Sequence, residues 1–375
     1  MKKSICSFLA LSSLSLICAP ALTFAYDVTL YGKADASVDY IDDGKDSETY
    51  IISNASFLGL KAEAELKEGI KGFGQFEIQY SLDGEGDKGD LDADTSDNPV
   101  LNSRNSGVGL KTEFGNVWFA GTWDEPVKGW SNGPPIDAFS LHLGQNSVII
   151  GGDYRVKNAI FYESPLLKGF QVQVAKGFSE GDEDNSKPGD AFTSDMVSGA
   201  LRYELKDKEI GDIYLCLATR QENNPSGYDY DNEVYRLTAQ YGRSLYSGSY
   251  TKGAFIYNID TNTDDNREVT AYWGTLSHKI NDWSLIVAYG MAEDDIRGQK
   301  QDLLAVGLIY NFTKDFAMYA TYANSGLDDE SLPALYNFGG NGRNEALTFP
   351  KGSDEQWGVS VGMVFRFNTV FSGGK

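Results

Sequence analysis

Four basic side chains stand on the polar side of segments in which polar and apolar residues alternate: Lys33, Lys61, Arg155 and Lys157. A β-strand sends successive side chains to opposite faces, so these charges are expected on one face of a sheet. A fixed charge beside a narrow aqueous path acts strongly on passing ions, because low-dielectric walls focus its field. These residues could therefore attract ions rather than make bonds. The alternative for each of them is a charge solvated in a wide space, where it contributes little.

Residues for catalysis or for cofactor binding are scarce in the sequence. The two histidines, His142 and His278, are separated by most of the chain, and no residues have the spacing of metal ligands. No nucleophile elbow, phosphate loop or nucleotide fingerprint stands in a context that would support it. Paired carboxylates are abundant, but they carry little information among 54 acidic residues. We predict that the protein is not an enzyme and has no cofactor or metal site.

The last alternating segment indicates which kind of sheet carries the basic residues. From Trp357 to Phe367, large apolar residues alternate with glycine, serine, valine and one arginine. A strand of this length crosses the hydrocarbon core of a bilayer at a tilt, with an apolar outside and small or polar groups inside. The pattern recurs along most of the chain and predicts an all-β transmembrane barrel. No segment has about eighteen consecutive apolar residues, so no transmembrane helix is expected.

Sixteen alternating segments follow one another, which predicts a sixteen-stranded antiparallel barrel as a single domain in residues 26–375. An even number of strands puts both termini at the same end. The segments 249–258 and 267–279 alternate poorly, so counts of fourteen and eighteen stay open. The predicted strands are Asp27–Tyr40, Ala55–Leu66, Lys71–Leu82, Asn102–Glu113, Asn116–Trp123, Tyr154–Glu163, Gly169–Phe178, Met196–Leu205, Asp212–Arg220, Glu233–Gly242, Ser249–Asn258, Arg267–Lys279, Trp283–Ala292, Asp302–Asn311, Phe316–Ala323 and Glu355–Phe367.

The connections between these segments are of two kinds. Short ones, such as Phe114-Gly115 and Asn281-Asp282, suit the periplasmic end of an outer-membrane barrel, and long acidic ones suit the outer end. In one long connection, Asp90, Asp92, Asp94 and Asp97 have roughly the spacing of a calcium loop, but the glycine and final glutamate of an EF-hand are absent. We favour solvated acids there. Collective bridging of divalent cations to anionic lipopolysaccharide stays open as the alternative.

The first 25 residues have the features of a secretory signal peptide. Lys2 and Lys3 precede a short apolar run, and Thr23-Phe24-Ala25 is a cleavage site of small residues. Removing the two lysines changes the net charge from -22 to -24, and such a chain repels nucleic acid. The other two cysteines leave with the signal, so Cys216 is the only one in the mature chain. Alternation places it toward the barrel interior as a small buried residue.

Aromatic residues make up 13% of the chain, and many stand near the ends of the predicted strands. That position is typical of the aromatic girdles at the two interfaces of a membrane barrel. The alternative is the core of a soluble β-sandwich, which would have strands of about six residues.

Several motifs in order along the chain resemble the general porins of Gram-negative outer membranes. They are Leu30-Tyr31-Gly32-Lys33, Phe57-Leu58-Gly59-Leu60-Lys61, Arg104, Gly109-Leu110-Lys111, Phe114-Gly115-Asn116, Tyr154-Arg155-Val156-Lys157-Asn158, Tyr162-Glu163-Ser164-Pro165 and Gly169-Phe170. The resemblance implies a homotrimer of sixteen-stranded barrels in the outer membrane, in contact with its lipid and lipopolysaccharide. Each barrel would pass small hydrophilic solutes and ions passively and would be narrowed by a third loop that folds inward.

Residues 124–153 are the candidate for that inward loop. They alternate little, carry few charges and include Trp130, Phe139 and Leu143, which are better accommodated inside a lumen than in open water. A loop that caps the outside or packs on a neighbouring molecule is the alternative. The family's Pro-Glu-Phe-Gly-Gly signature is missing, and Gly133-Pro134-Pro135 stands nearby instead.

The resemblance also implies that bases on the barrel wall face acids on the inward loop, which makes a transverse field across the pore. Arg104 is ambiguous by alternation and is placed inside only by its match to a wall arginine of the family. The candidate acids are Asp124, Glu125 and Asp137. Phe57 and Thr122 stand where relatives often carry further wall arginines. A thinner basic cluster beside so many acids predicts a modest preference for cations.

Two alternatives to a general diffusion porin stay open. A substrate-specific, sugar-type porin would carry a ladder of aromatic residues, to which Trp118 and Trp130 could contribute. A secreted β-rich glycan-binding protein is the third possibility. The residues 368–375 extend past the terminal phenylalanine at which the family normally ends, so either the tail is tolerated or Phe371 belongs to a longer strand.

Overall fold

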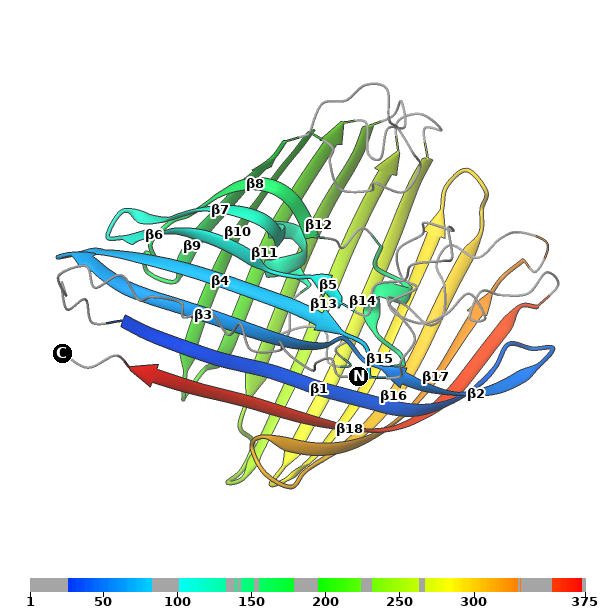
Figure 1. The fold of residues 1–375 in the computed structure, drawn as a ribbon. Helices are drawn as coiled ribbons and strands as arrows, with labels where there is room; N and C mark the ends of the chain where they lie inside the picture. The colour runs from blue at the N-terminus through cyan, green and yellow to red at the C-terminus, as the bar shows by residue number, and fades with distance from the viewer. Residues whose placement is uncertain are drawn as a thin grey trace, which may run out of the picture.

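The structure is a computed structural model and describes residues 26–82, 101–132, 139, 143–151, 155–178, 195–223, 231–262, 267–329, 331 and 353–372. Its strands form one closed antiparallel barrel, with neighbours in sequence order around the sheet (Figure 1). The strand β18 closes the barrel on β1, from Asp27 opposite Ser372 to Asp42 opposite Trp357. In the described residues, no helix is long and apolar enough to cross a membrane.

All sixteen predicted strands are present. The eighteen strand segments make sixteen barrel strands, because β2 and β3 both pair with β1, and β5 and β6 both pair with β4. The segments are β1 Tyr26–Asp42, β2 Ser47–Ser53, β3 Ser56–Lys67, β4 Ile70–Tyr80, β5 Leu101–Ser103, β6 Ser106–Thr112, β7 Gly115–Asp124, β8 Arg155–Glu163, β9 Phe170–Gly177, β10 Asp195–Asp207, β11 Gly211–Asn223, β12 Asp231–Arg243, β13 Ser249–Asn262, β14 Arg267–Ile280, β15 Trp283–Asp294, β16 Lys300–Asn311, β17 Phe316–Leu327 and β18 Glu355–Ser372.

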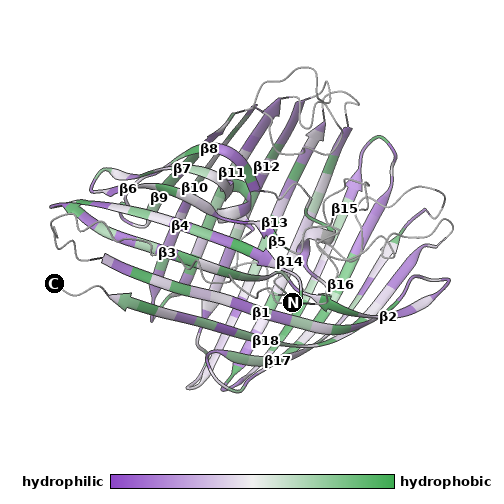
Figure 2. Ribbon diagram, in the orientation of Figure 1, coloured by the Kyte–Doolittle hydropathy of each residue, from purple (hydrophilic) through white to green (hydrophobic). Residues whose placement is uncertain are grey.

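The alternation along the strands separates an apolar outer face from an inner face of small and polar residues. In β18, Val359, Val361 and Met363 are exposed, whereas the intervening Ser360 and Gly362 are buried. Figure 2 shows hydrophobic and hydrophilic residues alternating along the strands. The predicted interior position of Cys216 is confirmed, since its side chain is 1% exposed. Exposed apolar side chains around a closed sheet are what a bilayer accommodates, because closure satisfies the backbone hydrogen bonds.

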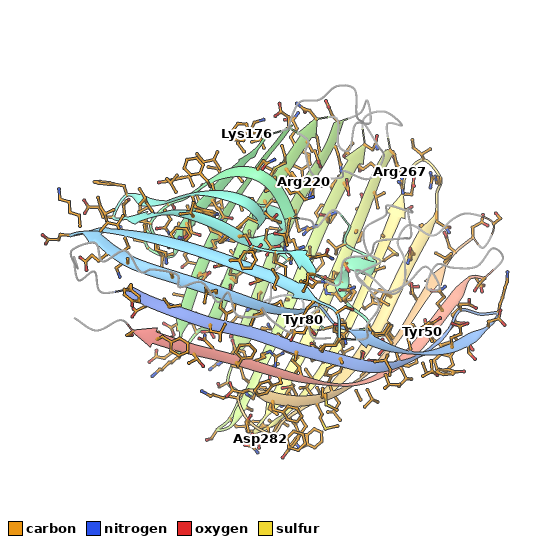
Figure 3. All side chains as sticks on the ribbon, in the orientation of Figure 1. Tyr50, Tyr80, Lys176, Arg220, Arg267 and Asp282 are labelled. Carbon is orange, nitrogen blue, oxygen red and sulfur yellow. The ribbon has the colours of Figure 1, made fainter. Side chains whose placement is uncertain are left out.

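The two ends of the barrel differ in their connections. At the end that we call the short-turn end, β3 and β4 are joined between Lys67 and Ile70, and β14 and β15 between Ile280 and Trp283. At the other end, the long-loop end, connections such as that from Tyr80 to Leu101 are longer. Figure 3 shows Asp282 at the short-turn end and Lys176 at the opposite end.

Several short turns share one construction, in which a tyrosine covers a glycine. Gly211 has a φ of +109°, and a Cβ built there would lie 2.9 Å from the ring of Tyr241 and 2.8 Å from the carbonyl oxygen of Gly242. The Tyr241 hydroxyl donates to the carbonyl of Ile210 at 2.7 Å. Gly115 and Tyr162 repeat the arrangement, with a hydrogen bond of 2.9 Å to the Phe114 carbonyl. Only glycine combines this backbone angle with so close an approach.

Beyond Phe367, the structure has the longer strand of the two alternatives. β18 continues to Ser372, and Asn368 to Ser372 pair with Tyr31 to Asp27 of β1. Residues 1–25, predicted to be the signal peptide, lie outside the described residues.

Candidate functional site: the inner loop and the charged wall

Of the connection from β7 to β8, residues 125–132, 139 and 143–151 are described; they lie inside the barrel, and we call them the inner loop. The inner loop contains the short helical turns η1 (Val127–Ser131) and η2 (Asn146–Val148). Val127, Leu143 and Ile149 are completely buried among inner-face residues of the wall that include Trp273 and Ala305. The loop therefore occupies the lumen, as the sequence predicted.

Glycines on the wall let two apolar side chains of the inner loop approach the strands closely. A Cβ on Gly307 would lie 2.7 Å from the ring of Phe139, and one on Gly358 would lie 3.0 Å from Leu143. Backbone carbonyls of the loop also accept hydrogen bonds from the wall: that of Ser131 from the Thr238 hydroxyl at 2.7 Å and those of Trp130 and Gly151 from the side chains of Tyr214 and Arg236. The loop is thus seated on the strands β11, β12, β16 and β18.

Glu125, at the start of the loop, is a fastening residue rather than a pore-lining one. Its side chain is 0% exposed and accepts hydrogen bonds from the backbone N–H groups of Val127 at 2.7 Å and Lys128 at 3.0 Å. The Ser198 hydroxyl on β10 donates to it at 2.6 Å, and the Arg220 guanidinium on β11 lies 3.5 Å away. The prediction that Glu125 faces the pore is corrected here, because these partners enclose its carboxylate.

Asp124, the last residue of β7, binds basic and polar side chains where the inner loop begins. Its carboxylate lies 3.2 Å from the Arg155 guanidinium and 3.6 Å from the Lys128 ammonium, and it accepts a hydrogen bond from Asn105 at 2.8 Å. The predicted base Arg155 and the predicted acid Asp124 therefore form one ion pair. The third candidate acid, Asp137, lies outside the described residues.

The opposite side of the interior, on β1, β3, β4 and β6, carries bases that are each paired with an acid of the same wall. The Lys33 ammonium lies 3.1 Å from the Asp35 carboxylate and donates to the Asn54 carbonyl at 2.8 Å. Lys61 lies 2.9 Å from Glu63, which also binds Lys111. Lys33 and Asp35, like Lys61 and Glu63, stand two positions apart on one strand and so share the inner face, whereas Lys111 of β6 reaches Glu63 of β3 across β4.

Arg104 lies on the same wall, between β5 and β6. Its guanidinium binds Glu77, donates to Gln79 at 3.0 Å and stands 4.8 Å from the centre of the Phe57 ring. The Arg104 guanidinium thus lies over the ring of Phe57, at a position where the family resemblance led us to expect a further arginine. We call the set Lys33, Asp35, Lys61, Glu63, Lys111, Glu77 and Arg104 the paired wall.

Lys157 does not follow the predicted alternation. Asn158, directly after it, has a φ of +47°, and Val156 is buried in the interior cluster of Trp118 and Phe161. With Val156 turned inward, the exposed Lys157 lies on the outer face of β8. A single residue in the left-handed region shifts the alternation by one position, which reverses the faces on either side of it.

Arginines on the far wall are the main interior residues that the sequence analysis missed. Arg202, Arg220 and Arg236 lie on the inner faces of β10, β11 and β12, where they contact the inner loop. The Arg202 guanidinium stands 4.1 Å from the centre of the Trp130 ring. Their signal is present in the sequence, because each shares its face with small residues such as Ala200 and Ala218.

The two tryptophans that could contribute to a sugar track are buried, and the described residues hold no candidate metal cluster. Within these residues, no group of three His, Cys, Asp or Glu side chains could hold a metal ion. Trp118 stacks on Phe161 at 4.8 Å between ring centres and is 4% exposed, and Trp130 is 7% exposed. The acids Asp90, Asp92, Asp94 and Asp97 lie outside the described residues.

Comparison with known sequences identifies the family. The sequence profile of Gram-negative porins matches residues 10–330. The major outer membrane protein P.IB of Neisseria meningitidis serogroup B is 25% identical over 330 residues, which cover 84% of this chain and 90% of that protein. An outer membrane porin protein of Bordetella pertussis is 23% identical over 346 residues, covering 78% and 87% of the two chains.

Comparison with solved structures gives the same architecture. The anion-selective porin from Comamonas acidovorans superposes with a TM-score of 0.66 at 22% identity, covering 91% of this chain and 100% of that one. The trimer form of OmpT of Vibrio cholerae superposes with a TM-score of 0.59 at 17% identity, covering 92% and 100%. Since the profile matches most of a chain that folds as a sixteen-stranded barrel with a loop in its interior, this protein belongs to the Gram-negative porin family and is a channel protein of the bacterial outer membrane.

Proposed function

We propose that the protein is a general diffusion porin that passes small hydrophilic solutes and ions without a dedicated substrate. The observation that carries this proposal is the paired wall, on which four bases lie within ion-pairing distance of three acids, Lys61 and Lys111 sharing Glu63. A paired charge offers a passing solute a dipole rather than a strong net field. Such a channel sorts solutes mainly by size and only weakly by charge.

The same pairing underlies the proposal of a modest cation preference. With most of the charge of the wall bases compensated by neighbouring acids, the sign of the potential in the channel follows the mature chain as a whole, whose net charge is -24 after Lys2 and Lys3 are removed from the total of -22. The similar porin of Comamonas acidovorans is anion-selective. The two proteins would then share a fold and differ in selectivity.

The non-specific function is favoured over a sugar-specific one by the burial of the tryptophans. A sugar track needs aromatic faces that are open to the aqueous path, whereas the faces of Trp118 and Trp130 are covered by Phe161 and Arg202. A homotrimer is the proposed assembly, and the trimer form of a similar porin supports it.

Reconstitution into planar bilayers tests the proposed function. The purified protein should form open channels whose conductance rises linearly with salt concentration and whose current is unaffected by maltose-type sugars at low concentration. In a salt gradient, the reversal potential should have the sign of weak cation selectivity. Saturating block by one sugar, or clear selectivity for anions, would contradict the proposal.

A further inference from the structure

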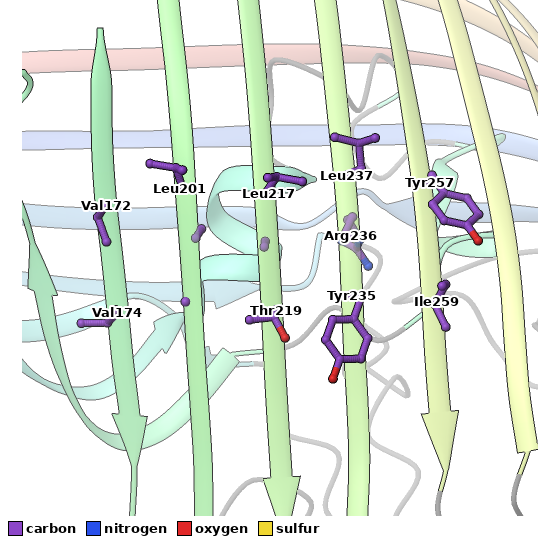
Figure 4. A pocket seen from close by; sticks show the side chains of 13 residues that line it. Val172, Val174, Leu201, Leu217, Thr219, Tyr235, Arg236, Leu237, Tyr257 and Ile259 are labelled. Carbon is purple, nitrogen blue, oxygen red and sulfur yellow. The ribbon is translucent and has the colours of Figure 1, made fainter. Parts of the chain in front are cut away.

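The end of β18 has an open edge at the short-turn end of the barrel. β17 begins at Phe316, opposite Phe365 of β18, so β18 continues to Ser372 with β1 as its only neighbouring strand in the described residues. Figure 1 shows this end of β18 (red) beside β1 (blue), with no strand on its other side. The strand that carries Leu217, by contrast, has a neighbour at both edges (Figure 4). Closure of the barrel therefore leaves a sheet edge exposed here, which we call the free edge, residues 367–372.

Backbone groups of three residues point out from the free edge. The Arg366 N–H donates to the carbonyl of Asp315, just before β17, so it points away from β1. In an antiparallel ladder the N–H and C=O of one residue point to the same side, and that side alternates along the strand. Asn368, Val370 and Ser372 therefore direct these groups away from β1, where the described residues offer no backbone partner. The free edge can accept a further strand.

The side chains of the free edge lie on two faces that are both partly open. Phe367 and Phe371 continue the apolar outer face of β18, and Phe371 is 56% exposed. Val370, on the inner face, is 57% exposed. An added strand with apolar side chains on both faces would cover parts of these residues in addition to pairing with the backbone.

Arg366 favours an acidic residue on such a strand. Its side chain is exposed on the inner face, opposite Lys33 of β1. Lys33 is already bound to Asp35, and among the described residues no acid side chain forms an ion pair with Arg366. An acidic side chain opposite Asn368 would lie on the same face, on the diagonal from Arg366, and within reach of its guanidinium.

From the open backbone groups and the unpaired arginine, we infer that the free edge binds an extended, acidic segment of a periplasmic protein by strand addition. The added strand would follow the line of β17 and, like β17, run antiparallel to β18. The short-turn end of an outer-membrane barrel faces the periplasm, so the partner approaches from the aqueous side. Backbone hydrogen bonds give such a complex its affinity, and alternate side chains give it specificity. The inference rests on the outer-membrane location of the barrel and is independent of the channel activity.

Fluorescence anisotropy with a labelled probe peptide tests the inference on the detergent-purified protein. The probe is Thr-Val-Val-Thr-Glu-Val with both termini capped, whose glutamate lies opposite Asn368 when its first residue lies opposite Ser372. We expect wild type to bind the probe about fivefold more tightly than the same peptide with lysine in place of glutamate. Arg366→Gln should remove that difference. Equal binding of the two peptides by wild type would overturn the inference.

Val370→Pro tests the backbone pairing. The Val370 N–H points away from β1, so proline removes an open donor without breaking a hydrogen bond of the ladder. We expect probe binding to weaken about tenfold. Thr369→Ala is the matched control, because the Thr369 N–H points toward β1 and every open donor is kept. It should bind the probe as wild type does, and equal binding by the two variants would show that the peptide adsorbs elsewhere.

Hydrogen exchange of the full-length protein tests whether the edge is open. The Val370 amide should exchange about tenfold faster than the Thr369 amide, and the probe should slow it. Equal protection of the two amides would overturn the inference. Protection of Val370 that disappears on dilution would also overturn it, and would assign the edge to a second copy of the chain. Conductance of the same preparations reports separately on the proposed function.

Discussion

A carboxylate without contact to water must be compensated by hydrogen bonds and opposite charge, because removing it from water is costly. Glu125 has two backbone donors, the Ser198 hydroxyl and the Arg220 guanidinium, which is itself buried. The pair joins the base of the inner loop to β10 and β11. Its role is to hold the loop still rather than to act on ions in the pore.

Removing one partner of this pair should therefore destabilise the folded protein. We expect Glu125→Ala to lower the free energy of unfolding by about 1–3 kcal/mol, because it removes the acceptor of three hydrogen bonds and leaves Arg220 with Glu222, at 3.8 Å, as its acidic partner. It should also raise the open-channel current noise as the inner loop loosens. Urea unfolding in detergent and single-channel recording measure the two effects. The exposed Glu65→Ala is the control, and an equal effect there would argue against fastening by Glu125.

Within the paired wall, the two partners of one ion pair should give opposite changes in selectivity. Arg104→Gln leaves the Glu77 charge uncompensated and should raise the cation-to-anion permeability ratio by roughly twofold. Glu77→Gln leaves Arg104 and should lower the ratio by a similar factor. Reversal potentials at low salt measure both. Shifts of the same sign would indicate a change in pore shape instead of charge.

At the scale of the strands and turns, the tyrosine-covered glycines connect neighbouring hairpins. Gly211→Ala should destabilise the barrel by about 1–3 kcal/mol, since alanine is strained at this backbone angle and meets the Tyr241 ring. Tyr241→Phe should cost about 1 kcal/mol through the lost hydrogen bond to Ile210. Urea midpoints would measure both. Gly253→Ala, at an open position, should be close to neutral.

The seat of the inner loop is a second feature at this scale. Gly307→Val would place its side chain where the Phe139 ring lies and should move the loop toward the channel axis. The expected result is a lower single-channel conductance with the barrel intact. Gly274→Val, whose nearest atom is 3.9 Å from a built Cβ, is the control. Unchanged conductance in Gly307→Val would mean that the loop does not narrow the channel.

The strands could be predicted from the sequence because their signal is local. Alternation with a period of two identifies a strand and its outer face, and even the poorly alternating β13 and β14 were found. The breaks were not predicted: Ala55 between β2 and β3 has a positive φ that alanine gives no reason to expect, and Asn158 in β8 has one that asparagine permits but does not require. The interior position predicted for Lys157 is wrong because Asn158 interrupts the alternation.

The interior contacts of the site could be predicted less well, because their partners are distant in sequence. Glu125 meets Ser198 and Arg220, which are 73 and 95 residues away, and no local pattern reports such a pair. Alternation places the wall bases Lys33 and Lys61 inside, and it places the neighbouring acids Asp35 and Glu63 on the same face. These ion pairs within one strand are therefore predictable from the sequence.

At the scale of the whole molecule, stability depends on the closure of the barrel. A chain ending at Phe367 loses the pairing of Asn368–Ser372 with β1, so the first residues of β1 keep one neighbour, β3. We expect this truncation to lower the temperature at which the folded form is lost on gels, with channel conductance retained. Substitution of Asn368–Ser372 by serines, which keeps the backbone pairing, is the control. An unchanged temperature would show that these last pairs add nothing.

Because the last strand, β18, pairs with the first, β1, the barrel can close only after the whole chain is available. The edge of the first strand emerges into the periplasm early and has no partner until the final residues have been delivered. A truncated chain thus exposes the unpaired backbone N–H and C=O groups of β1, with which a strand of another chain can pair. A copy cut short before β18 leaves that edge of β1 unpaired and therefore open to pairing with other chains.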